Sequence, residues 1–393
     1  MRILRALIAP WRSTDLKAHS RLALFSRLPR LALAGACSVL AFAAHAACPP
    51  SAIASLGKPG AAVGQWNAAD RGLLWRADRD GRTAWLYGTI HLGRADWVRP
   101  GPTVQKALEQ SDALALELDT RDQATMRALT QPADPQVVAR LLSGERAQRL
   151  ARQREAACVP PDATAGLQPI LQVMALTGLV ARADGLYPEF GADEALAVSA
   201  RNNNKPVFAL ESAASQLKML TGDSEAEEAE QIDAALDELE SGQLRMQMKE
   251  LADMWARGDA DKLGRYSEWC NCLDTPAERR LMKRLLDERN PGLADGIERM
   301  HAGGKRVFAA VGALHMVGPQ GLPALLAARG FTVSAVPLSA QPPVAVPTAP
   351  EPKAAARGGR NAKGATAKGT GKRTGNAKPA TRGAPAPKAK QRR

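Results

Sequence analysis

Two histidines lie far apart in the chain but in the same local sequence, an apolar run followed by Gly-x-x-His. His91 comes three residues after Gly88, and His315 comes three residues after Gly312. Each apolar run predicts a buried strand that ends near its glycine. Ligands bind at the carboxyl ends of strands in an α/β sheet, where an imidazole can act as a base or a metal ligand. The repeated pattern therefore predicts one shared site. The alternative for each copy is a histidine packed at a strand end and hydrogen-bonded to the backbone.

Two glutamates follow apolar runs in a similar way. Glu117 lies inside the run 113–118, and Glu211 ends the run 206–210. A carboxylate in a buried strand is costly unless it is paired, hydrogen-bonded or bound to a cation. We therefore expect Glu117 to share an edge with His91, brought there by neighbouring parallel strands. The alternatives are that Glu117 reaches water at its strand end and that Glu211 serves the N-terminus of the next helix.

The spacing of apolar residues predicts the elements that position these side chains. Asp80-Gly81 separates two apolar runs, which predicts a β-hairpin whose second strand leads to His91. Residues 122–200 and 223–258 have helical spacing. The chain therefore predicts an α/β fold with some α+β character, in which helices flank a central mixed sheet and the middle segment is largely helical.

Composition divides the chain into four parts. Residues 1–46 combine basic residues with an apolar run and end on Ala44-His45-Ala46, which predicts a signal peptide cleaved after Ala46. We expect a tether at 47–64, the folded domain at 65–338, and a tail at 339–393. The tail is dominated by Pro, Ala, Gly, Lys and Arg and is expected to be disordered. The protein is then periplasmic or secreted; the alternative for the leader is an uncleaved anchor.

The net charge of +13 belongs to the two ends of the chain. Residues 1–46 carry seven Lys/Arg and one acidic residue, and residues 351–393 carry thirteen and one. The remainder holds 33 basic and 38 acidic residues, which gives no reason to expect a specific nucleic-acid partner. The basic tail suits salt-sensitive attraction to anionic envelope polymers or a membrane surface. A solubilising extension without a partner is the alternative.

Four cysteines remain after the predicted cleavage: Cys48, Cys158, Cys270 and Cys272. An even number in an exported protein predicts two disulfide bonds. A bond between Cys270 and Cys272 would be strained, so we expect each of them to pair with Cys48 or Cys158. A C-x-C metal site is the alternative, but no second Cys/His cluster in the sequence completes it.

Together these motifs resemble those of the TraB/GumN family (TraB/PrgY/GumN), which also includes the animal Tiki metalloproteases. The resemblance rests on Gly88-Thr89-Ile90-His91, Glu117-Leu118-Asp119, Leu210-Glu211, Arg289-Asn290 and the segment 311–318. It implies a fold similar to that of erythromycin esterases and ChaN-like haem-binding proteins. It also implies a metal or catalytic centre made of His91, Glu117 and His315, with Arg289 as a further catalytic group. Weaker candidates are Gly88, Glu211, Asn290 and Gly312.

Three functions compete on these grounds. The preferred one is an exported metal-dependent hydrolase of peptide or ester bonds, of the Tiki metalloprotease type, with manganese, cobalt or zinc as the cation. Arg289 would hold an oxyanion or a substrate carboxylate, or would instead cap the helix that it ends. The second is a non-catalytic envelope protein that binds haem, a metal or a peptide. The third is an envelope-tethering protein whose basic tail is the active part.

Overall fold

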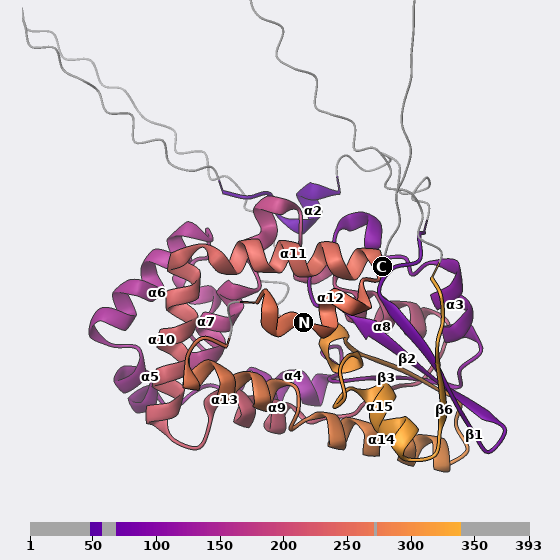
Figure 1. The fold of residues 1–393 in the computed structure, drawn as a ribbon. Coiled ribbons are helices and arrows are strands. Elements are labelled where there is room, and N and C mark those ends of the chain that lie inside the picture. The colour runs from indigo at the N-terminus through magenta and orange to yellow at the C-terminus, as the bar shows by residue number, and fades with distance from the viewer. Residues whose placement is uncertain (1–47, 57–67, 271–272, 339–393) are drawn as a thin grey trace, which may run out of the picture. The chain divides into compact units, whose positions relative to one another are not determined.

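The computed structural model describes residues 48–56, 68–270 and 273–338. Its strands form one six-stranded sheet in the order β4-β3-β5-β2-β1-β6 (Figure 1). The strands are β1 (Leu73–Arg79), β2 (Arg82–Thr89), β3 (Ala113–Leu116), β4 (Val207–Ala209), β5 (Val307–Gly312) and β6 (Thr332–Ala335). Helices surround the sheet, so the predicted α/β architecture with a central mixed sheet is confirmed.

The sheet has a parallel half and an antiparallel half. Strands β4, β3, β5 and β2 run parallel to one another, whereas β1 pairs antiparallel with both β2 and β6. The predicted hairpin joins β1 to β2 through Asp80 and Gly81, which both have positive φ, 52° and 70°. Asp and Gly are among the residues that tolerate this backbone conformation, which a tight hairpin turn requires.

One expectation about strand order is wrong. We expected the strands that lead to His91 and Glu117 to be neighbours, but β5 lies between β2 and β3 and pairs with both. A strand from late in the sequence is thus inserted between two early ones. Local sequence does not contain this information, because it depends on where a long crossover returns to the sheet.

Two apolar layers cover the faces of the sheet. Side chains alternate along β5, so that Val307, Ala309 and Val311 face one layer and Phe308 and Ala310 face the other. The first layer is completed by α14 (Asn290–Ala302) and α15 (Leu322–Ala328), and the second by α3 (Pro102–Glu109), α8 (Ala192–Asn202) and α11 (Gln243–Arg257). The central strands β3 and β5 are therefore buried on both faces, as parallel strands usually are.

The middle of the chain builds a separate helical region with its own apolar core (Figure 1). Its large buried side chains include Leu150, Ile170, Leu176, Ile232 and Leu236. The remaining helices are α2 (Ala52–Ser55), α4 (Gln123–Leu129), α5 (Pro135–Leu141), α6 (Gly144–Ala156), α7 (Pro169–Thr177), α9 (Ala213–Thr221), α10 (Glu225–Ser241), α12 (Ala260–Gly264) and α13 (Pro276–Leu285). The predicted helical character of the middle segment is confirmed.

The disulfide pairing differs from our expectation. Cys48 bonds to Cys158, with 5.8 Å between their Cα atoms, so neither residue is left for the pairs that we predicted. Cys270 is also disulfide-bonded. The expectation was wrong because it paired Cys48 and Cys158 with Cys270 and Cys272 and did not consider that the two could bond to each other. Instead, the Cys48 bond attaches the segment that carries α2 to the loop after α6 (Gly144–Ala156).

The predicted signal peptide and basic tail lie outside the described residues, as do half of the tether and Cys272. Within the described parts of the chain, no helix has the length and apolar character needed to cross a membrane.

Candidate functional site

The four parallel strands end at one edge of the sheet, and each is followed directly by one of the predicted site residues. Glu211 follows β4, Glu117 follows β3, His315 lies in the short 3-10 helix Ala313–Met316 after β5, and His91 follows β2. Along the sheet the order is thus Glu211, Glu117, His315, His91. Hydrogen bonds from the Glu211 amide to the Glu117 carbonyl (2.9 Å) extend the strand pairing up to these residues. The predicted convergence on one edge follows from this topology.

Glu117 is held in a buried position by contacts from two directions. Its Oε1 accepts a hydrogen bond of 2.6 Å from the Gly312 amide, and its Oε2 accepts one from Arg289. Its side chain is only 10% exposed. Burial raises the pKa of Glu117, but His315, His91, Arg289 and the Gly312 N–H outweigh it, and the resulting pKa is about 2. Glu117 is therefore a carboxylate at neutral pH.

Arg289 occupies the centre of the cluster. It lies immediately before α14, and its five N–H groups all have partners within the chain. Nε donates to Glu211 (2.9 Å), one terminal nitrogen donates to Glu117 and Glu211, and the other donates to the Leu285 carbonyl (3.0 Å) and to His315 Nε2 (3.1 Å). Burial lowers the pKa of Arg289, and the two carboxylates more than reverse this effect. Arg289 thus joins both candidate glutamates to His315 and has no N–H left for a substrate unless one of these bonds breaks.

His315 is buried, and its contacts fix its tautomer. Arg289 has only N–H donors, so Nε2 of His315 must accept, and the ring proton must be on Nδ1. Nδ1 then donates to Oδ1 of Asn290 over 2.6 Å, while Nδ2 of Asn290 donates to the Gln320 carbonyl. Burial lowers the pKa of His315 to about 4, because the charged ring would lose its hydration. The weaker candidate Asn290 is therefore the residue that orients His315.

His91 has the opposite character. Its imidazole is 69% exposed, and Nδ1 lies 3.2 Å from a carboxylate oxygen of Asp193 in the first turn of α8. The charge of Asp193 raises the pKa of His91 to about 9. No hydrogen bond to Nε2 occurs among the described residues. The edge therefore holds one exposed histidine that favours its charged form and one buried histidine that favours its neutral form.

Asp193 was missed by the sequence analysis. The loop that carries it is fastened to the segment after β2 by backbone hydrogen bonds from Gly93 to Tyr187 (3.0 Å) and from Ala192 to Ile90 (2.8 Å). A side chain at Gly93 would lie 1.9 Å from the Phe190 carbonyl oxygen, so only glycine permits this approach. A carboxylate in the first turn of a helix was the only local signal, and it is too common to identify a partner for His91.

The two glycines of the repeated motif have a steric role. A Cβ atom at Gly312 would lie 3.1 Å from Oε1 of Glu117 and 3.5 Å from the ring of His315. A Cβ atom at Gly88 would lie 3.1 Å from Cα of Ala313. Both glycines thus allow the strand ends and the residues after them to pack closely.

The predicted metal site requires that His91, Glu117 and His315 have lone pairs free for a cation. A ligand must offer a free lone pair, but the Nε2 lone pair of His315 accepts from Arg289, whereas each hydrogen-bonded oxygen of Glu117 keeps a second lone pair. Among residues 48–56, 68–270 and 273–338, no group of three His, Cys, Asp or Glu side chains is placed to hold a metal ion. In this arrangement Nε2 of His315 becomes open to a cation only once Arg289 releases it, and the site of His91, Glu117 and His315 stays a prediction.

The fold and this edge define the class of protein: an α/β protein with a buried ionic cluster and an exposed histidine at the ends of its parallel strands. A family model described as TraB/PrgY/gumN matches residues 73–335, and the chain belongs to that family. It is 29% identical over 277 residues to the uncharacterized protein YbaP of Escherichia coli strain K12, an alignment that covers 64% of this chain and 96% of YbaP. The YbaP protein of Shigella flexneri matches to the same extent. No solved structure matches significantly.

Proposed function

We propose that this protein is an exported hydrolase of peptide or ester bonds, with His91 as the group that transfers protons. The observation that carries the proposal is the exposed His91 ring, which Asp193 orients, beside the buried cluster of Glu117, Arg289 and His315. A base whose second nitrogen is fixed by a carboxylate is the arrangement that acyl-transfer enzymes use.

The chemistry requires His91 in its neutral form. With Nδ1–H donating to Asp193, Nε2 can remove a proton from water as the water oxygen bonds to the substrate carbonyl carbon. The intermediate then collapses and expels the alcohol or amine, which takes the proton back from Nε2. Glu117, Arg289 and His315 supply a fixed, hydrogen-bonded wall beside this reaction and do not themselves transfer the proton.

The cation-dependent form of the proposal needs one further event. Manganese, cobalt or zinc could join His91, Glu117 and His315 only after Arg289 releases Nε2 of His315 and the Glu117 carboxylate. Such a cation would supply Lewis-acid chemistry when bound. Elemental analysis of protein purified without a His-tag tests this form: a stoichiometric metal that is lost in both His91→Ala and His315→Ala supports it, and unchanged metal content in both variants refutes it.

Export is part of the proposal, and the Cys48–Cys158 bond supports it, because such bonds persist in oxidising compartments. Fractionation of cells followed by mass analysis of the mature protein tests it. A chain that begins at Ala47 in the periplasm or medium is the expected result, and a full-length chain in the cytoplasm contradicts it.

Hydrolysis is tested with a panel of chromogenic esters and peptide amides. The wild-type rate should rise with pH toward a plateau above about pH 9, since His91 must lose its proton, and Asp193→Asn should move this rise toward the ordinary histidine value. His91→Ala should abolish the activity, and Asp253→Asn, at a surface pair with Lys249, should leave it unchanged. Activity that survives in His91→Ala contradicts the proposed role.

A second candidate is a non-catalytic binding protein, and one observation favours it. Every N–H of Arg289 and both ring nitrogens of His315 are satisfied within the chain, which leaves His91 as the exposed member of the cluster. Haem titration followed by absorbance distinguishes the two functions. A Soret shift that disappears in His91→Ala, without hydrolysis of any substrate in the panel, selects the binding protein.

A further inference from the structure

A mostly apolar cavity of about 280 Å³ lies between α7, α10, α11 and α13. Aliphatic side chains dominate its walls, among them Ile170, Met174, Leu220, Leu244, Met248 and Leu251. Several of these are only partly buried, and Met174 is 37% exposed. Partly exposed apolar walls gain free energy when an apolar ligand covers them. The size is near the lower limit of the cavities that hold small ligands.

The cavity adjoins the edge cluster. Leu285 and Leu314 line it, the Leu285 carbonyl accepts the hydrogen bond from Arg289, and Leu314 directly precedes His315. Helix α13 lines the cavity from Ala277 to Leu285, which corresponds to about 12 Å of helix. A ligand along this wall could therefore place one end beside the cluster.

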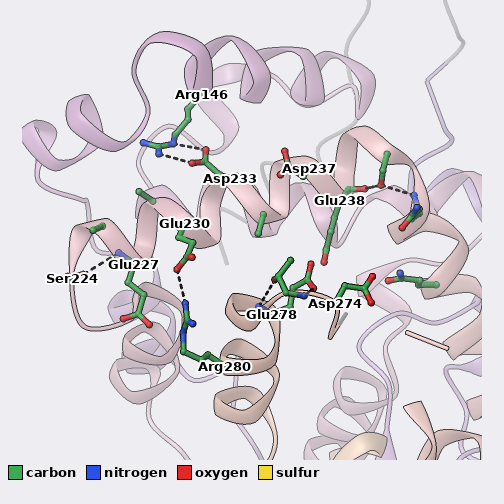
Figure 2. A pocket seen from close by; sticks show the side chains of 17 residues that line it. Arg146, Ser224, Glu227, Glu230, Asp233, Asp237, Glu238, Asp274, Glu278 and Arg280 are labelled. Atoms are coloured by element: carbon green, nitrogen blue, oxygen red, sulfur yellow. Dashed lines mark hydrogen bonds and ion pairs between the residues drawn. The ribbon is translucent and has the colours of Figure 1, made fainter. Parts of the chain in front are cut away.

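The opposite end of α13 faces a different environment. Glu278 in its first turn also lines an open hollow of about 930 Å³, whose walls carry many carboxylates (Figure 2). Some of these carboxylates form ion pairs with arginines: Arg146 pairs with Asp233 at 2.7 Å, and Arg280 pairs with Glu230 at 3.2 Å (Figure 2). An anionic head group would be repelled by this acidic end, which leaves the end beside Leu285 and Leu314 for the head of the ligand.

We propose that the cavity binds the acyl chain of the substrate, so that the bond to be cleaved lies at the exposed His91. This inference rests on the proposed hydrolase and names its substrate class, an ester of a medium or long aliphatic acid. The walls favour an acyl chain because most of their surface is apolar, whereas a peptide backbone needs a hydrogen-bond partner for each of its polar groups.

Binding is measured first, without catalysis. The neutral fluorescent probe N-phenyl-1-naphthylamine is bound to the full-length protein and displaced by methyl esters of increasing chain length. Each added methylene should tighten binding about three- to fourfold until the cavity is full. Chain-length-independent displacement overturns the inference, as does stronger displacement by an apolar peptide than by the esters.

Matched variants locate the binding. Ala234 lines the cavity on α10, and Ala226 is exposed on the same helix away from it. Ala234→Trp should weaken binding of the longest ester at least about tenfold, because it removes space for about two methylenes. Ala226→Trp should have no effect. Met248→Ala, from a different wall, should move the preferred chain length upward even if Ala234→Trp folds poorly. Equal effects of the two tryptophans, with no change in Met248→Ala, overturn the inference.

Hydrolysis of p-nitrophenyl acetate, butyrate and octanoate separates this inference from the function on which it rests. Hydrolysis that depends on His91 but not on chain length leaves the hydrolase standing and removes the acyl cavity. Chain-length-dependent binding without hydrolysis of any ester leaves the cavity standing and removes the hydrolase. If the protein is a hydrolase and the cavity binds the acyl chain, the octanoate should be hydrolysed faster than the acetate and the butyrate. The Ala234→Trp variant should lose this preference.

Discussion

Nδ1 of His315 and Oδ1 of Asn290 are 2.6 Å apart, and this hydrogen bond decides what His315 can do. Because Nδ1 carries the proton, Nε2 presents its lone pair to Arg289. A buried neutral imidazole can thus accept from a guanidinium without placing two positive charges side by side. Asn290 is itself oriented by donating to the Gln320 carbonyl. Each hydrogen bond therefore runs the same way, from Arg289 to His315, from His315 to Asn290 and from Asn290 to Gln320.

Replacing Asn290 by alanine should destabilise the protein. The Nδ1–H group of His315 would lose its partner in a buried position, at a cost of about 1–3 kcal/mol, and the exposed Gln320 carbonyl would lose one as well. Urea unfolding followed by circular dichroism measures the change. Asn203→Ala is the control, because that exposed amide bonds only to the Ser199 carbonyl of its own helix and should lose much less. Equal losses in both variants would contradict the special role of Asn290.

The two site histidines should titrate on opposite sides of the ordinary value of 6.5. Burial lowers the pKa of His315 to about 4, whereas Asp193 raises that of His91 to about 9. NMR titration of the imidazole carbons measures both, and His91→Gln and His315→Gln assign the signals. In Asp193→Asn the His91 value should fall, while the His315 value stays low. Two signals near 6.5 would show that neither environment acts as described.

The same shifts determine how stability depends on pH. A histidine whose pKa is lower in the folded than in the unfolded protein contributes its full stability at a pH above the unfolded pKa. The contribution of His315 is therefore lost as the pH falls from 6.5 to about 4. The loss is on the order of 3 kcal/mol, since the group is almost fully buried. Glu117 adds a second loss between 4.5 and about 2. His91 acts in the opposite direction, and its smaller contribution disappears as pH rises from 6.5 to about 9.

Local sequence was sufficient for the elements but not for their order. Asp80-Gly81 predicted the hairpin because a two-residue turn needs residues that accept positive φ. The apolar run 307–311 predicted a buried strand because both faces of β5 are covered. The place of β5 between β2 and β3 depends on contacts across about two hundred positions, and periodicity does not contain them.

The site was predictable to a similar extent. His91, Glu117, Glu211 and His315 could be placed on one edge, since each follows a strand of the parallel half. The role of Arg289 as the common partner of both glutamates could not be derived, because it reaches the edge from the start of a helix. The same limit applies to Asp193, whose position is set by backbone contacts between two distant loops.

The Cys48–Cys158 bond predicts a specific loss on reduction. It closes a loop with a sequence separation of 110, and its removal frees the unfolded chain, which typically costs about 2–4 kcal/mol. Cys48→Ser, Cys158→Ser and the double variant should therefore unfold at similar, lower urea concentrations. Peptide mapping under non-reducing conditions should find the two cysteines in one linked pair in the wild type. A double variant that is much less stable than either single one would indicate that each cysteine has another partner.

Arg289 should be far more important for stability than an arginine at the surface. Its side chain is 13% exposed and pairs with Glu117 and Glu211, which are 10% and 14% exposed. Arg289→Met would leave two buried carboxylates without their cation, which typically costs about 3–5 kcal/mol. Arg280→Ala is the control, since its pair with Glu230 is exposed at both ends and should contribute less than about 1 kcal/mol. Adding Glu117→Gln to Arg289→Met should restore part of the stability, because a neutral amide needs no cation. A double variant no more stable than Arg289→Met would mean that Arg289 acts by packing and not by charge.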